Sequence, residues 1–135
     1  MSETTCRPLV FVINDDTAFL DLMEQLIRDD GYEPECLKTS VGAFEKIKAR
    51  RPEAIVLDIR INNEESGLLL LDLITLDPET RQIPVIVASA NLNALAGRQQ
   101  ELAEKGIYLM AKPFDIDDLS ALLRRAIAGR EATGR

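Results

Sequence analysis

The chain has 135 residues, which at roughly 100–200 residues per domain predicts one domain with its own core and no room for a second. Its composition, 46% hydrophobic and 29% charged, is that of an ordinary soluble globular domain. Acidic residues outnumber Lys and Arg by 23 to 16, and the net charge of −7 disfavours binding to nucleic-acid phosphates or anionic lipid. Histidine is absent, which excludes Ser-His-Asp and Cys-His nucleophiles, histidine-ligated metals and phosphohistidine on this chain.

No apolar run approaches the roughly 18 residues of a membrane span, and the N-terminus lacks the pattern of a secretory signal. We therefore expect a cytoplasmic protein that has neither a membrane nor nucleic acid as a partner. The two cysteines, Cys6 and Cys36, lie beside apolar runs and are too few for a zinc site. Both are expected to be reduced thiols packed at strand margins.

Five apolar segments of strand length alternate with amphipathic segments of helix length, which is the pattern of βαβ units. The predicted strands are Leu9–Ile13, Glu35–Leu37, Ala54–Leu57, Val85–Ala88 and Ile107–Ala111. The predicted fold class is therefore α/β, a three-layer αβα, flavodoxin-like, doubly wound parallel five-stranded sheet in strand order 2-1-3-4-5.

The first predicted helix is amphipathic and ends before Gly31, a residue suited to the left-handed position after a helix. Its inward side chains recur at three-to-four spacing and are Phe19, Leu22, Met23, Leu26 and Ile27. Thr39-Ser40 offers a cap for the second helix, which Pro52 stops. The inward side chains of this second helix are Ala43, Phe44 and Ile47.

The third predicted helix, Gly67 to Leu76, is capped by Ser66 and is apolar almost all round. Such a helix either packs deeply or shows an apolar face to a partner, and we expect core packing. The fourth helix, Ala94 to Lys105, has few apolar anchors, which indicates weak attachment and mobility.

Asp115 is predicted to cap the fifth helix, and Gly129 is predicted to end it. Its inward stripe is Ile116, Leu119, Leu122, Leu123, Ala126 and Ile127. Residues 1–8 are expected to form an N-terminal extension and residues 130–135 a flexible tail.

Polar residues follow four of the five predicted strands at their carboxyl ends. They are Asn14, Asp15 and Asp16 after the first strand, Asp58 after the third, Ser89 after the fourth and Lys112 after the fifth. In an open sheet of order 2-1-3-4-5, ligands bind at this edge, between the first and third strands. Carboxylates gathered there favour a hard cation, and Mg²⁺ prefers oxygen ligands while keeping several waters.

An aspartate beside Mg²⁺, with a hydroxyl and an ammonium group near by, is able to attack phosphorus and form an acyl phosphate. Asp58 is the candidate nucleophile, and the cation, Lys112 and Ser89 would hold the phosphoryl oxygens. Any one of these residues alone would more often be a cap or a turn former. Their coincidence at four strand ends favours the functional interpretation.

These segments resemble the receiver domain of two-component response regulators, from Leu9 to about Ile127. The segments that carry the resemblance are Asn14-Asp15-Asp16, Ile55-Val56-Leu57-Asp58, Val87-Ala88-Ser89-Ala90 and Lys112-Pro113-Phe114. The resemblance implies a receiver domain over residues 9–129 in which Asp58 is the phosphoacceptor and Ser89 and Lys112 bind the phosphoryl group. It also implies that Asp15, Asp58 and the backbone carbonyl of Arg60 ligate Mg²⁺, and that Tyr108 is the conformational reporter.

The family places an acidic pair after the first strand, whereas here Asn14 takes the first place if Asp15 takes the second. The alternative register pairs Asp15 with Asp16. We prefer the former because it keeps the usual interval to Phe19 and Leu20 of the following helix. In that register the pocket lacks one negative charge, and Asn14 contacts the metal through a bound water. We then expect Mg²⁺ to bind more weakly than in a relative with two acids.

The expected function is a single-domain response regulator that takes a phosphoryl group onto Asp58 from a histidine kinase or phosphotransfer protein. The fourth helix, fifth strand and fifth helix would relay the change to an effector protein, since no DNA-binding segment follows residue 129. Catalysis would be limited to its own phosphotransfer and dephosphorylation. One alternative is a receiver-like docking module that is never phosphorylated, at which only Asn14 hints. Another is a metal-dependent phosphohydrolase, for which no insertion is long enough to form a substrate lid.

Overall fold

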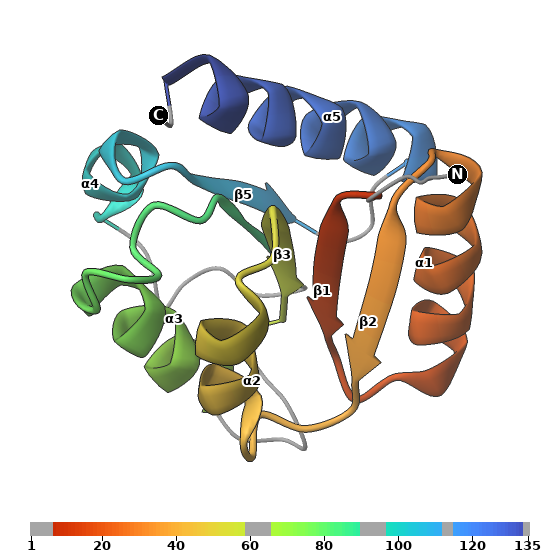
Figure 1. Ribbon diagram of the computed structural model, residues 1–135, viewed down its shortest axis with the longest axis horizontal. Helices are drawn as coiled ribbons and strands as arrows, with labels where there is room; N and C mark the ends of the chain where they lie inside the picture. Colours follow the sequence, from red (N-terminus) through yellow and green to blue (C-terminus); the bar gives the residue numbers. More distant parts are fainter. Residues whose placement is uncertain (1–6, 59–65, 90–96, 112–114, 134–135) are drawn as a thin grey trace.

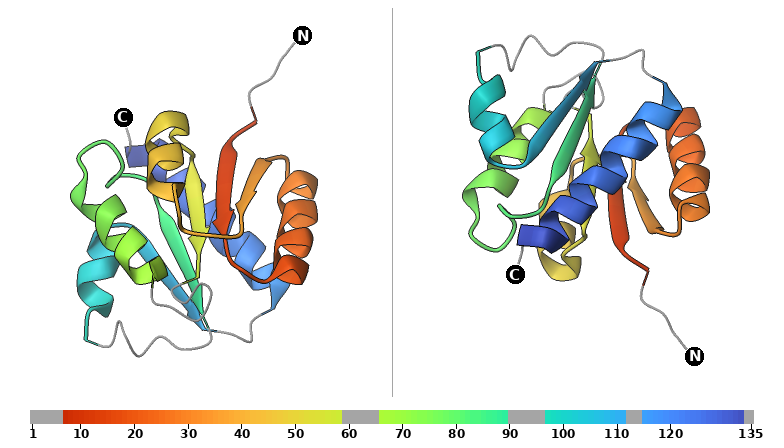
Figure 2. Two further views of the ribbon diagram at one scale, coloured as in Figure 1. Left: turned by 90° about the horizontal axis from the view of Figure 1, so that it is seen from below. Right: turned by 90° about the horizontal axis from the view of Figure 1, so that it is seen from above.

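The computed structural model describes residues 7–58, 66–89, 97–111 and 115–133. In that part of the chain, helices cover both faces of one parallel sheet, which gives three layers (Figure 1, Figure 2). None of the helices described is long and apolar enough to cross a membrane.

The sheet has five parallel strands in the order β2-β1-β3-β4-β5. Their bounds are β1 Leu9–Ile13, β2 Glu33–Leu37, β3 Ala54–Leu57, β4 Val85–Ser89 and β5 Ile107–Ala111. The predicted fold class and strand order are confirmed. The differences are at strand ends, since β2 begins before the predicted Glu35 and β4 includes Ser89.

Two layers of helices enclose the sheet. The helices are α1 Thr17–Asp29, α2 Ala43–Arg50, α3 Ser66–Leu76, α4 Gln99–Glu104 and α5 Ile116–Thr133. Helices α1 and α5 cover one face of the sheet, and α2, α3 and α4 cover the other (Figure 1). Their buried side chains form two core clusters, one on each face. The order of the strands and the crossing helices bring the carboxyl ends of β1 and β3 together at the middle of one edge.

Strand alternation divides the sheet residues between the two layers. In β1, Phe11 and Ile13 face the α2/α3/α4 layer, whereas Val10 and Val12 face the α1/α5 layer. The same division holds in β3, where Ile55 and Leu57 alternate with Ala54 and Val56. Because both faces are covered, these strands are continuous apolar runs, which is why the sequence located them well.

The starts of α1 and α2 correct two predictions. Leu22 was expected to face inward, but it is exposed, because the buried row of α1 consists of Leu20, Met23 and Ile27. Thr39-Ser40 does not cap α2. Gly42, with a φ of 75°, precedes the helix and no side chain caps it, so a left-handed glycine makes the turn.

Helix α3 contradicts the prediction of core packing on one of its sides. Leu70, Leu71 and Ile74 are buried against the sheet, as expected. Leu69, Leu73 and Leu76 are 63%, 41% and 75% exposed. A helix on the outside of a sheet buries only the stripe that faces the sheet, whatever residues occupy the other side.

The last two helices differ from their predicted bounds. Helix α4 begins at Gln99 and not at the predicted Ala94; Gly97 has a φ of 84°, and Arg98 is the non-helical N-cap residue. The Oδ1 atom of Asp115 accepts a hydrogen bond from the Asp117 amide at 2.9 Å, so the predicted cap of α5 is confirmed.

The predicted end of α5 at Gly129 is wrong. The helix continues to Thr133. Gly129 is exposed and does not have a positive φ, and one glycine inside a helix costs only about 1 kcal/mol relative to alanine.

Candidate functional site

The carboxyl ends of β1 and β3 lie side by side and carry the first part of the predicted site. Ile13 pairs with Leu57 in register, and the Asp58 amide donates a hydrogen bond to the Ile13 carbonyl at 3.1 Å. The Asn14 amide donates to the Leu37 carbonyl of β2 at 3.0 Å. The residues that follow the two central strands, Asn14 and Asp58, are therefore neighbours at this edge.

Asn14 is almost completely buried, with 2% of its surface exposed. Its Oδ1 atom accepts a hydrogen bond from the Asp16 amide at 2.9 Å, which closes a turn between β1 and α1. A buried polar side chain needs such a partner, because an unpaired one loses its hydration without compensation. Asn14 therefore fixes the backbone on both sides of Asp15.

Asp16 has a structural task that the sequence analysis missed. Its Oδ1 atom accepts hydrogen bonds from the Ala18 amide at 3.0 Å and the Phe19 amide at 3.4 Å, which makes Asp16 the N-cap of α1. The signal was an aspartate directly before the first helical residue. Because these bonds hold the Asp16 carboxylate at the helix, they favour the register that pairs Asn14 with Asp15.

The exposure of the two remaining acids suits a reacting site. Asp15 is exposed, and Asp58 is half-buried at the end of β3. A half-buried carboxylate is open to an incoming donor and is held by its strand at the same time. Asp58 is therefore not walled off from solvent, as the predicted nucleophile requires.

The other predicted site residues divide into three groups. Ser89 ends β4, pairs in register with Ala111 of β5, and so lies at the same edge of the sheet. Lys112 and Arg60 lie outside the described residues, as does Cys6, which was predicted to be a packed thiol and not a site residue. Tyr108 is the second residue of the edge strand β5, pairs with Ile86 and packs in the α1/α5 layer, so the structure does not bring it to the carboxyl edge.

The donor set at this edge fits Mg²⁺. Asp15 and Asp58 offer carboxylate oxygens from two adjacent strand ends, and Mg²⁺ keeps several waters and needs few protein ligands. The Asn14 Oδ1 atom retains a second lone pair for a metal-bound water after it has accepted the Asp16 amide hydrogen. In the described part of the chain, no group of three or more His, Cys, Asp or Glu residues forms a ready metal cluster.

A surface pocket of about 630 Å³ lies at the opposite edge of the sheet. Its lining includes Pro84 and Gly106, which precede β4 and β5, together with Arg81, Lys105 and Tyr108. Ligands of doubly wound sheets bind at the carboxyl ends of strands, and this pocket is at the amino ends. The predicted site residues that the structure describes at the carboxyl edge therefore lie at a different edge from the pocket.

A family model described as the response regulator receiver domain matches residues 10–124. The nitrogen assimilation regulatory protein NtrX of Azorhizobium caulinodans is 31% identical over 123 residues, which cover 87% of this chain and 26% of NtrX. The chain thus spans about a quarter of the length of that relative.

Two solved structures share the fold. A CheY-like receiver domain protein of Methanospirillum hungatei has a TM-score of 0.78 at 23% identity, covering 93% of this chain and 98% of that one. The receiver domain of the sensor histidine kinase PA1611 of Pseudomonas aeruginosa has a TM-score of 0.73 at 24% identity, covering 91% and 99%. The PA1611 domain holds a magnesium ion coordinated in its active-site cleft.

Proposed function

Because the chain belongs to the response regulator receiver domain family of two-component systems, we propose that it is a switch that accepts a phosphoryl group on Asp58. Receiver domains are signalling phosphoacceptor modules and not classical enzymes. The observation that carries the proposal is the half-buried Asp58 at the end of β3, hydrogen-bonded through its amide to the end of β1.

The proposed donor is a phosphohistidine of a partner histidine kinase or phosphotransfer protein. A carboxylate oxygen of Asp58 attacks phosphorus, an O–P bond forms, the P–N bond to the donor imidazole breaks, and that nitrogen keeps the electron pair. Ser89 and Lys112 are the proposed partners of the phosphoryl oxygens. Hydrolysis of the acyl phosphate by water then resets the switch.

The proposed metal ligands are Asp15, Asp58 and the backbone carbonyl of Arg60, with Asn14 reached through a bound water. When bound, Mg²⁺ neutralises charge on the phosphoryl and carboxylate oxygens. The magnesium ion in the PA1611 receiver domain supports this part of the proposal. Asp15 and Asp58 orient the site, and the strand ends that carry them keep both carboxylates at the same edge.

The output surface is proposed to be α4, β5 and α5, with Tyr108 as the conformational reporter and an effector protein as the receiver of the signal. Helix α4 has only six residues, and Leu102 is its one side chain in the buried core among those described. A short helix with one anchor costs little to move. The expected cytoplasmic location and the absence of membrane and nucleic-acid partners stay predictions.

Mass measurement after incubation with a small acyl phosphate and Mg²⁺ tests the proposal. We expect a phosphate-sized mass gain that disappears in Asp58→Ala and shrinks when a chelator is added. Asp72→Ala, an acid of α3 away from the site, is the matched control and should keep the gain.

Three results would overturn or redirect the proposal. A mass gain that survives in Asp58→Ala would place the phosphate elsewhere. No gain in the wild type, with either the small donor or a phosphorylated kinase, would favour the docking module. Steady turnover of a model phosphate ester would favour the phosphohydrolase.

A further inference from the structure

We propose that Asn14 is a positioning residue that presents side-chain N–H donors beside Asp58 and so lowers the demand of this site for a divalent cation. The inference rests on the proposed function, because it concerns the charge that gathers at Asp58. The proposed role of Asn14 is more than the loss of one negative charge at this position. The amide supplies donors where the first acid of an acidic pair supplies only acceptors and one more negative charge.

The hydrogen bonds of Asn14 fix which end of its amide faces which way. The Oδ1 atom accepts from the Asp16 amide at 2.9 Å, so the oxygen faces the β1–α1 turn and the Nδ2 group takes the other side. Within the residues that the structure describes, Nδ2 has no hydrogen-bond partner, although Asn14 is only 2% exposed. A buried amide that donates nothing is costly and points to an oxygen acceptor that joins it in the working state.

The register of the sheet identifies the neighbour that needs such a donor. Ile13 and Leu57 are paired, so Asn14 and Asp58 are the next residues on adjacent strands, which run roughly 4.8 Å apart. Val12 and Val56, two residues earlier, both face the α1/α5 layer. Strand alternation therefore puts the side chains of Asn14 and Asp58 on the same side of the sheet.

Charge at this edge rises when Asp58 carries a phosphoryl group, because a carboxylate is exchanged for an acyl phosphate with more negative charge. Donors of a neutral amide stabilise such charge without adding any of their own. An aspartate at the same position would add a buried negative charge next to Asp15 and Asp58, and a divalent cation would then be needed to offset it. The amide and the cation are in this sense partial substitutes.

Asn14→Asp separates this role from a merely structural one, because aspartate keeps the acceptor for the Asp16 amide and removes only the donors and the neutrality. In unphosphorylated protein we expect a lower thermal midpoint without Mg²⁺, a larger stabilisation by Mg²⁺, and a Kd for Mg²⁺ at least tenfold smaller by calorimetry. Gln82→Glu makes the same amide-to-acid change at an exposed residue before β4, at the opposite edge of the sheet, and should leave all three values unchanged. Wild-type values in Asn14→Asp would overturn the inference.

Asn14→Ala removes the donors without adding charge, and it decides the matter if Asn14→Asp does not fold. We expect its phosphorylation by a small acyl phosphate to fall about tenfold in chelator and less than twofold in saturating Mg²⁺. A structural role alone would lower both rates in the same proportion, and that result would contradict the inference. The Mg²⁺ titrations need no phosphorylation, so they remain interpretable if Asp58 proves not to be the acceptor.

Discussion

The two helical layers differ in the polar groups that they hold inside. The structure describes three buried polar side chains, Asn14, Thr80 and Ser120. Ser120 lies in the α1/α5 layer, where its hydroxyl donates to Asp30, the residue that follows α1, and accepts from Arg124 at 2.8 Å. Strand alternation assigns Asn14 to the same layer. Thr80 lies in the loop after α3 and donates to the Ile74 carbonyl at 2.8 Å, so it closes a helix end.

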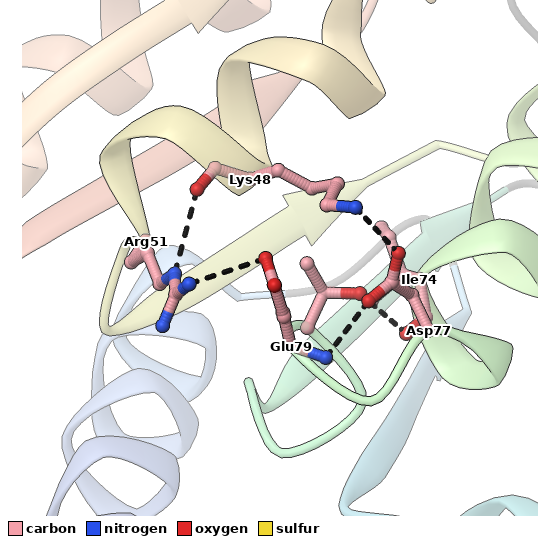
Figure 3. Close-up of polar contacts among 6 residues, drawn as sticks. Lys48, Arg51, Ile74, Asp77 and Glu79 are labelled. Atoms are coloured by element: carbon pink, nitrogen blue, oxygen red, sulfur yellow. Dashed lines mark hydrogen bonds and ion pairs between the residues drawn. The ribbon is translucent and has the colours of Figure 1, made fainter.

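The α2/α3/α4 layer keeps its charged contacts at its outer rim. Lys48 of α2 pairs with Asp77 at 3.0 Å and Arg51 pairs with Glu79 at 3.1 Å, both across to the loop that follows α3 (Figure 3). Between this rim and the sheet lie leucine and isoleucine side chains. One layer thus supplies apolar burial, while the other also holds polar side chains inside, of which Asn14 lies at the strand ends that carry the predicted site.

The largest effect should come from the apolar layer. Leu71 of α3 is fully buried, and Leu71→Ala should lower the free energy of unfolding by about 3 kcal/mol, through lost burial and the cavity that remains. Urea unfolding measures this loss. The Mg²⁺ dependence of phosphorylation should be unchanged below the unfolding transition, because Leu71 itself is a core side chain and not one of the predicted site residues.

Leu69→Ala is the matched control, since it makes the same change two residues earlier at a side chain that is 63% exposed. Its effect should stay within about 0.5 kcal/mol. Equal losses in the two variants would show that the outer side of α3 is covered in solution and would break the distinction between its two sides.

The sequence located the strands well where burial leaves little choice. β1 and β3 are covered on both faces and are bounded by polar or proline residues, and their predicted bounds are the observed ones. β2 was predicted too short because it starts with Glu33 and Pro34. Polar residues and proline are acceptable there because β2 is an edge strand with a partner on one side only.

The parts that the sequence could not supply depend on tertiary contacts. A helix that is apolar all round, such as α3, carries no pattern that says which side faces the sheet. The continuation of α5 past Gly129 depends on the helix already being anchored by Leu123 and Ile127. The position of the candidate site residues at the carboxyl ends of the strands could be predicted from chain order and parallel pairing. The exact tasks of Asn14 and Asp16 depended on hydrogen bonds that residue types alone leave open.

The second effect concerns the Cys36 thiol in the α1/α5 layer. Burial, with smaller contributions from Glu24 and Glu35, raises the pKa of Cys36 from 9.0 to about 11. The thiolate fraction near neutral pH should then be about 100-fold lower than in unfolded chain, and alkylation of folded protein should be slower by at least that factor. Iodoacetamide labelling in a Cys6→Ser background, with urea-unfolded protein as the reference, measures the ratio.

The sign of the pH dependence gives this prediction a second test. A thiol whose pKa is raised in the folded state stabilises the fold below the unfolded pKa of 9.0, and that contribution is lost as the pH rises toward about 11. Cys36→Ala should therefore flatten the loss of stability over this range. If folded and unfolded chains label equally fast, the α1/α5 layer admits solvent at β2. The contrast drawn between the two helical layers would then be weaker.

The smallest effect belongs to the charged rim. The Glu79 amide and Lys48 hold the pKa of Asp77 below its ordinary value, and Asp77 raises the pKa of Lys48. Ionised Asp77 therefore favours the fold at neutral pH, and this contribution is lost as the pH falls from 3.8 through the lower folded pKa.

A double-mutant cycle of Lys48→Met and Asp77→Asn measures the coupling, because methionine keeps the packing near Phe44 and asparagine keeps an acceptor for the Glu79 amide. We expect a small coupling that vanishes in high salt and at acid pH, since both groups are accessible to solvent. A coupling that persisted in high salt would make this rim part of the packed structure, and the contrast between an apolar interior and a solvated border in the α2/α3/α4 layer would no longer hold.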